Sequence, residues 1–233
     1  LASSLERGPR IIQSVIGAES LRLSATGNIF PRYDTALMPA PALRTSNTQL
    51  ANAMIVPDAD GVVRRIPMLT QVGDRRYPTL GIAALEAFTG QTLALEIENG
   101  KMTWGTLKLP VDSQGQMPIN FTTGQPIFSA MDVINGQVAP DSLRNKIVLI
   151  GLINSAARQE LRIPLLMGSQ PRMPVEIHAD VIDMILGNHL LLEQDRLTEI
   201  ILIFLVALMA GATLPHVRVL TACGLTLVYA LMY

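Results

Sequence analysis

Two apolar runs without a charged residue, 200–214 and 219–233, constrain the fold of this chain more than any other feature. Each run is shorter than the roughly 20 residues that a helix needs to span about 30 Å of hydrocarbon. The window 197–217, however, has Glu199 as its only charge, and a charge near a helix end can lie at the membrane interface. We therefore expect a transmembrane helix over 197–217 and a truncated second one over 218–233. Core helices of a soluble protein are the alternative.

The charges around the first run predict an orientation. The residues just before it are acidic on balance, whereas Arg218 lies in the short segment that follows it. Positively charged loops tend to stay in the cytoplasm, so the large N-terminal part would face outward. The chain does not open with the apolar stretch of a signal peptide. We therefore expect an export segment ahead of Leu1 and interpret the chain as a fragment.

Composition limits the partners of the N-terminal part. The net charge is −1 at pH 7 and only 16% of the residues are charged, so there is no positive excess for nucleic acid or anionic lipid. We expect no nucleic-acid partner. The only cysteine, Cys223, lies in the second apolar run, and residues 1–196 are numerous enough to fold as one domain without a disulfide.

Hydrophobic patterning predicts short strands and helices in this part. A buried strand is expected over 10–16 and a long surface loop over 28–47. The runs 51–56 and 62–72 flank a Pro-Asp-Ala-Asp-Gly turn, which is typical of a hairpin. Further strands are expected over 93–97, 101–104, 107–109 and 117–121. Helices are expected over 1–8, 79–88 and 129–134.

The end of the polar part has a strand-then-helix pattern. The continuous apolar run 146–150 is expected to be a strand, and 174–186 has the apolar spacing of an amphipathic helix. This order favours a parallel central pair of strands, while the hairpins earlier in the chain exclude an all-parallel sheet. The predicted fold class is α/β, a mixed sheet with flanking helices, followed by a transmembrane helical hairpin.

Two groups of acidic residues were considered as metal sites. Asp58, Asp60 and Gly61 resemble the start of a calcium loop, but the remaining ligands of such a loop are missing, which favours a plain turn. The last soluble helix carries Glu176, His178, Asp180 and Asp183. Glu176 and Asp180 are four residues apart, and His178 is out of line with both. A solvated face with a capping or core histidine is the favoured interpretation, with a ligand or metal site as the alternative. We expect no metal and no cofactor.

The segment after the predicted strand 146–150 is the candidate ligand site. Ligands of open α/β sheets tend to bind beyond the carboxyl ends of parallel strands, where the polar segment 154–162 would lie. No nucleophile elbow, P-loop or dinucleotide fingerprint occurs there, so no catalytic residue is predicted. The candidate ligand-binding residues are Asn154, Ser155, Arg158, Arg162 and His178.

Several short motifs follow one another in a characteristic order. From the N-terminus they are DADGVVRRIPML, YPTLGIAALEAF, MPINFTTG, FSAMDVINGQVAPDSLRNKIVLIG and MPVEIHADVIDMILGNHLL, followed by the apolar runs. In order and spacing they resemble the CHASE type 2 domain, closely over 50–192 and weakly over 1–47. The resemblance implies an extracytoplasmic sensor region attached to bacterial adenylate cyclases, histidine kinases and related effectors. It also implies one membrane helix before the domain and usually three after it.

The chain departs from this family in two places. Pro174 meets Val175 directly, where the family commonly has a glycine between them. After the strand the family commonly has an aspartate, where this chain has Ser155 to Glu160 without one. No ligand contact of that aspartate is therefore carried over.

The expected function is a sensory input domain in the inner membrane, with its soluble part periplasmic or extracellular. The expected partners are an unknown small-molecule or protein stimulus, the lipid bilayer and a second copy of the chain. One alternative is a membrane-anchored enzyme with a site near residues 154–162. The other is a structural module that holds two receptor chains together.

Overall fold

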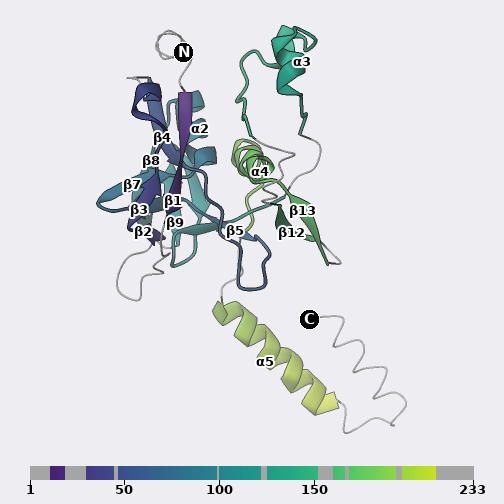
Figure 1. Cartoon of the computed structure of the whole chain (residues 1–233). Helices are drawn as coiled ribbons and strands as arrows, with labels where there is room; N and C mark the ends of the chain where they lie inside the picture. The colour runs from purple at the N-terminus through teal and green to yellow at the C-terminus, as the bar shows by residue number, and fades with distance from the viewer. Residues whose placement is uncertain are drawn as a thin grey trace. The chain divides into compact units, whose positions relative to one another are not determined.

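The computed structural model of the chain describes residues 11–18, 30–44, 47–98, 100–121, 125–151, 160–165, 168–192 and 196–213. The chain divides into two compact units, Leu1–Leu191 and Leu192–Tyr233. Among the described residues, the first unit contains all of the strands and three of the four α-helices (Figure 1).

The first unit is a mixed α/β structure built from several small sheets. The strands are β1 (Ile11–Ala18), β2 (Arg32–Tyr33), β3 (Thr35–Leu37), β4 (Thr48–Asn52), β5 (Arg65–Pro67), β6 (Leu69–Val72), β7 (Arg75–Pro78), β8 (Leu93–Glu98), β9 (Lys101–Trp104), β10 (Leu107–Pro110), β11 (Gln116–Pro118), β12 (Leu161–Leu165) and β13 (Gly168–Arg172). The helices are α2 (Leu80–Thr89), α3 (Ala130–Ile134) and α4 (Pro174–Leu186), with short 3-10 turns η1 (Pro41–Leu43) and η2 (Pro140–Ser142).

Parallel and antiparallel pairs both occur, as the sequence predicts. β1 pairs in parallel with β4 and antiparallel with β3, and β2 pairs in parallel with β6, which pairs antiparallel with β7. β8, β9 and β10 form an antiparallel meander. The prediction of an α/β fold is confirmed, but the described strands form five small sheets and not one mixed central sheet.

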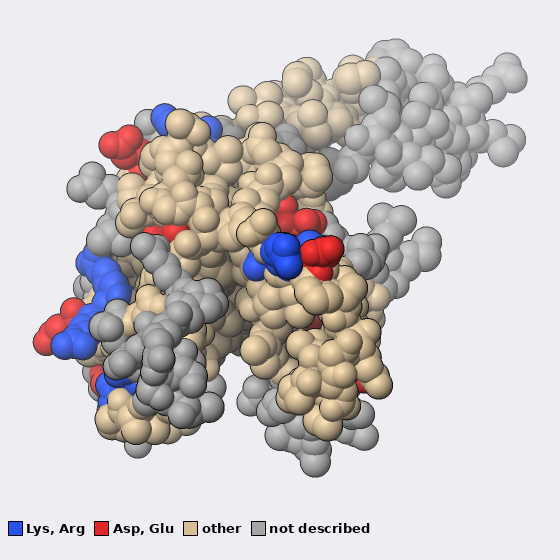
Figure 2. Space-filling view, turned by 90° about the horizontal axis from the view of Figure 1, so that it is seen from above, with Lys and Arg blue, Asp and Glu red and all other residues tan. Residues whose placement is uncertain are grey.

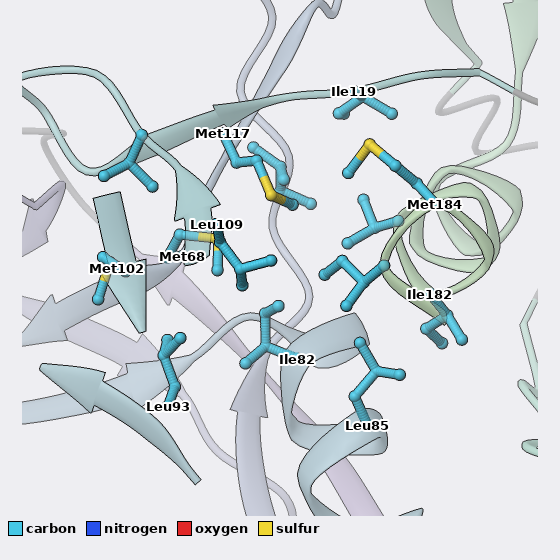
Figure 3. Packing of buried hydrophobic residues seen from close by; sticks show 14 of the residues in the cluster. Met68, Ile82, Leu85, Leu93, Met102, Leu109, Met117, Ile119, Ile182 and Met184 are labelled. Atoms are coloured by element: carbon cyan, nitrogen blue, oxygen red, sulfur yellow. The ribbon is translucent and has the colours of Figure 1, made fainter. Parts of the chain in front are cut away.

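The core lies where α2 and α4 meet the strands. Ile82 and Leu85 of α2, together with Met184 of α4, pack against buried side chains of the meander and of β11 (Figure 3). Gly81 allows the two helices to approach, because a Cβ there would lie 3.2 Å from the His178 carbonyl oxygen and 3.3 Å from Val181 Cγ1. Burial of such apolar surface is the main stabilising contribution to a domain of this size.

Most of the predicted elements are present. The strands expected over 10–16, 93–97, 101–104, 107–109 and 117–121 correspond to β1, β8, β9, β10 and β11. The helices expected over 79–88, 129–134 and 174–186 correspond to α2, α3 and α4. Ser129 caps α3 as expected, since its hydroxyl oxygen accepts a hydrogen bond from the Met131 amide at 3.2 Å. The helix expected over 1–8 lies outside the described residues.

The hairpin predicted between 51–56 and 62–72 is wrong. The turn exists, with Gly61 N donating to Asp58 O at 2.8 Å, but the strands on either side of it pair elsewhere. β4 pairs with β1, and β5 pairs with β11. A turn signal fixes only the local direction of the chain and does not determine which strands pair.

The long surface loop predicted over 28–47 is also wrong for its described residues. β2, β3 and η1 lie in this region, and Phe30 and Tyr33 are buried. The prolines, serines and threonines of this segment suggested a loop, whereas its two aromatic side chains anchor it to the core.

The strand predicted over 146–150 is not formed. Ile147 and Leu149 pack against the core, while Val148 and Ile150 are exposed, and the segment has no partner strand among the described residues. An apolar run alone cannot distinguish a paired strand from an extended segment with one buried face. The antiparallel hairpin β12–β13 follows it, so the parallel pair predicted for this end is wrong. Pro164 and Pro171 argue against strands in this segment. Both strands of the hairpin are edge strands, however, where proline is tolerated.

The second unit contains α5 (Arg196–Thr213), whose large apolar side chains are mostly exposed. α5 begins and ends close to the bounds of the predicted helix 197–217. Among the described residues, no helix has both the length and the apolar character required to cross a membrane. The remainder of the predicted membrane hairpin, 214–233, lies outside the described residues.

Candidate functional site

The predicted ligand residues fall into three groups. Asn154, Ser155 and Arg158 lie outside the described residues. Arg162 is an exposed residue of β12, and its backbone carbonyl accepts a hydrogen bond from Val63 N at 2.7 Å. His178 is only 1% exposed and belongs to the core. The rationale for this site was the carboxyl end of a strand over 146–150, and that strand is absent.

His178 links α4 to the segment that follows β4. Its Nε2 atom lies 3.1 Å from the Ala53 carbonyl oxygen, which can only accept a hydrogen bond, so Nε2 carries the hydrogen. Nδ1 is buried and has no partner among the described residues. Burial lowers the pKa of His178 to about 4, although its bond to Ala53 acts in the opposite direction. The imidazole is therefore neutral near pH 7, and the interpretation of His178 as a core histidine is confirmed.

Asp180 is not on a solvated face, which corrects the interpretation of this helix. It is fully buried, and Arg172 Nη2 lies 3.0 Å from its Oδ1 atom and 3.1 Å from its Oδ2 atom. Glu176 has a different structural role. Its carboxylate accepts a hydrogen bond from the Met173 amide at 2.9 Å and caps the helix. The two carboxylates four residues apart therefore do not form a joint site. The helical spacing of the acidic residues does not indicate that Arg172, from the preceding strand β13, binds Asp180.

The turn 58–61, which contains Asp58 and Asp60, is stabilised by ion pairs with Arg64. Arg64 donates to Asp58 Oδ2 at 2.9 Å and to Asp60 Oδ2 at 2.7 Å, and Asp60 Oδ1 accepts a hydrogen bond from Val62 N at 3.0 Å. The hydrogen bond from Arg64 is the main reason that the pKa of Asp60 falls to about 2. Gly61 has φ +80°, as the turn requires. Among the described residues, no group of three or more His, Cys, Asp or Glu side chains is placed to hold a metal ion.

A cavity of about 200 Å³ opens beside this turn. Its wall comes from β2, the end of β4, β6 and the segment 54–59, and residues from the β11 region complete it. The polar residues of its lining are Tyr33, Asn52, Asp58, Thr70, Gln114 and Gln116. Prolines, Met54 and Val56 form most of the remaining wall.

Two buried polar side chains form a hydrogen-bonded pair in this cavity wall. Asn52 Nδ2 donates to Thr70 Oγ1 at 2.8 Å, and Asn52 Oδ1 accepts from Met54 N at 3.1 Å. Burial raises the pKa of the Tyr33 hydroxyl, which lines the same cavity. None of these residues was predicted. The available signal was a polar residue inside each of the apolar runs 51–56 and 62–72, because a buried polar side chain requires a partner.

Charged side chains of both signs occur on the described residues of one face (Figure 2). Positive and negative side chains are interspersed on the face drawn in Figure 2, in keeping with the net charge of −1. A polyanion would therefore find no extended basic patch on the described residues of this face.

Comparison with known proteins identifies the family. The fold defines the class, a mixed α/β domain whose last core helix is followed along the chain by an apolar helix. Residues 1–213 match the CHASE2 domain, and the chain therefore belongs to the CHASE2 family. CHASE2 domains are extracytoplasmic sensor domains of signalling receptors and are generally non-catalytic. No curated protein and no solved structure matches the chain.

Proposed function

We propose that this chain is the extracytoplasmic sensory input domain of a bacterial transmembrane receptor. It receives a small-molecule or protein stimulus and passes it through membrane helices to a cytoplasmic effector absent from this chain, an adenylate cyclase or a histidine kinase. Membership of the CHASE2 family supports the sensory role. The receptor lies in the inner membrane as a homodimer, with residues 1–196 periplasmic or extracellular.

The observation that carries this proposal is the position of α4. Its face with Ile177, Val181 and Ile185 is buried in the core, and the chain continues from its end at Leu186 to the start of α5 at Arg196. A change in the packing of α4 can therefore be passed on through a short connection. The stimulus would act by binding one of two packings of the domain more tightly than the other. A ligand can shift the equilibrium between two states only if its affinity for them differs.

The apolar character of α5 supports a membrane location for the connection. Its exposed side chains include Ile200, Phe204 and Leu208, which is unfavourable in water unless lipid or protein covers them. A membrane helix over 197–217 would be followed by Arg218 on the cytoplasmic side and by the start of a second membrane helix over 218–233.

Reporter fusions in the complete receptor test the location. An enzyme that is active only in the periplasm should be active when fused after Leu192 and inactive when fused after Val217. A fluorescent protein that matures only in the cytoplasm should give the opposite result. High periplasmic activity at both positions, or at neither, would contradict the proposed topology.

A further inference from the structure

The cavity beside Tyr33 contains unused hydrogen-bonding capacity. Among the described residues, no group accepts a hydrogen bond from the hydroxyl of Tyr33 or from that of Thr70, whose oxygen already accepts from Asn52. Tyr33 is 4% exposed and Thr70 is 1% exposed. The enclosed polar atoms of the described residues that lack a partner do not include the Tyr33 oxygen, so this hydroxyl is accessible from the cavity. Water or a ligand in the cavity can accept a hydrogen bond from it and from the Thr70 hydroxyl.

The rim of the cavity provides further donors and acceptors. Gln116 Nε2 donates to Gln114 Oε1 at 3.0 Å, which leaves the amide hydrogens of Gln114 and the carbonyl oxygen of Gln116 available. The apolar part of the wall, with Met54 and Val56, offers a surface for carbon atoms. Convergent polar groups on a partly apolar wall are the usual composition of a small-molecule site.

The lining favours an uncharged ligand. Its only ionisable carboxylate is that of Asp58, and Arg64 already donates to it at 2.9 Å. A charged ligand would lose hydration without gaining a counterion. The volume of about 200 Å³ equals that of about six liquid water molecules at roughly 30 Å³ each, which suits a polyol or a single sugar ring.

We propose that this cavity binds an uncharged, hydroxyl-rich small molecule and that the segment Asn52–Ala53–Met54 connects its occupancy to α4. The connection is direct. Asn52 and Met54 line the cavity, while the carbonyl of Ala53 between them accepts the hydrogen bond from His178 on α4. A ligand that repositions Asn52 therefore also shifts the acceptor of His178. This assignment of a ligand class rests on the proposed sensory function.

Methyl NMR of the whole chain in detergent micelles tests the binding. The probes are glycerol, myo-inositol and D-glucose at 10 mM, each compared with a charged counterpart: glycerol 3-phosphate, myo-inositol phosphate and D-gluconate. At least one neutral probe should shift the ε-methyl signal of Met54, while that of Met102 in the meander stays unchanged. No shift with any neutral probe, or equal shifts with the charged counterparts, would overturn the assignment.

Variants locate the interaction. Thr70→Val and Tyr33→Phe each remove one hydroxyl and should weaken binding of the neutral probe about three- to tenfold, the range expected for one hydrogen bond. Thr70→Ser restores the hydroxyl and should restore binding. Tyr77→Phe is the matched control, because Tyr77 is also buried but does not line the cavity. Equal effects of the two tyrosine variants would overturn the site.

A second measurement separates this assignment from the sensory function. A receptor whose effector responds to its stimulus equally well with Thr70→Val would be a sensor that uses another site. A neutral probe that shifts Met54 without ever altering effector output would confirm the cavity as a binding site and contradict the proposed connection from Asn52–Ala53–Met54 to α4.

Discussion

Arg172 of β13 and Asp180, in the middle of α4, form an ion pair with Nη2 and Oδ1 3.0 Å apart. The Asp180 side chain is fully buried, and that of Arg172 is 14% exposed. Removal of water from both groups is costly, so the pair adds little net stability, but the loss of one partner leaves the other charge buried without this ion pair. The pair holds the hairpin β12–β13 against α4.

Loss of the arginine should therefore destabilise the domain more than loss of the pair. We expect Arg172→Met to lower the free energy of unfolding by about 3–5 kcal/mol, and the double variant Arg172→Met/Asp180→Leu to recover most of that loss. Urea unfolding in mild detergent, followed by the fluorescence of Trp104, the single and buried tryptophan, measures both. A double variant as unstable as Arg172→Met would contradict the buried pairing.

The buried imidazole of His178 should make stability depend on pH. Its pKa is about 4 in the folded domain and 6.5 in the unfolded chain, so between these values only the unfolded chain binds the proton. The free energy of unfolding should therefore fall as the pH falls from about 6.5 to about 4, by about 2 kcal/mol at pH 5 relative to pH 7.

The variant His178→Gln isolates this effect. Its amide can still donate to the Ala53 carbonyl, but it does not titrate. The difference in unfolding free energy between wild type and His178→Gln should change by about 2 kcal/mol between pH 7 and pH 5. A constant difference over this range would mean that His178 is accessible to protons in the folded domain.

The conformation of Gly61 gives a third prediction. With φ at +80°, a β-branched side chain there is strained even though a Cβ would meet nothing within 4 Å. Gly61→Val should destabilise the domain by about 1–3 kcal/mol, and Gly61→Asn by clearly less, because asparagine tolerates this region. Equal unfolding midpoints of the two variants would contradict the turn conformation.

The ion pairs in the same turn can be tested with calcium. Because Arg64 already donates to Asp58 and Asp60, millimolar calcium should leave the melting temperature unchanged. A rise in wild type that is absent in Asp58→Ala would show that the carboxylates bind the cation in preference to the arginine.

The sequence predicts well those elements that are determined by residues close to one another along the chain. The meander β8–β10 has turn residues between short apolar strands, and α4 has both a helical period and a capping glutamate. The parallel pairing of β4 with β1 depends on contacts distant in sequence, which no local pattern contains. The hairpin β12–β13 is local, but Pro164 and Pro171 are unfavourable in most strands, so its sequence does not have the pattern of a hairpin.

The candidate site illustrates the same limit. The sequence leaves His178 as a capping histidine, a core histidine or a ligand residue. The structure places it in the core, where its partner Ala53 is distant in sequence. The cavity is lined by Tyr33, Asn52 and Thr70, from three strands. The sequence predicts a loop around Tyr33 and a hairpin between the runs that contain Asn52 and Thr70, and neither is formed. The predicted segment 154–162 depended on a strand over 146–150 that does not form.

The coupling between the domain core and the effector is the central claim, and Ile182 is the residue that tests it. Ile182 is buried where α4 faces α2, and its Cγ1 atom would lie 3.6 Å from a Cβ at Gly81. Ile182→Ala leaves a cavity there and should cost about 2–5 kcal/mol, whereas Ile182→Val should cost about 0.5–1.5 kcal/mol. Both change the packing of the helix that leads to α5.

The decisive measurement is the effector output of the complete receptor in membranes, at equal protein level, with and without stimulus. We expect Ile182→Ala to change the basal output, Ile182→Val to change it in the same direction by less, and the exposed control Lys108→Ala to leave it at the wild-type value. A folded Ile182→Ala receptor whose output matches wild type under both conditions would show that α4 does not couple the domain to the membrane, and would contradict the account.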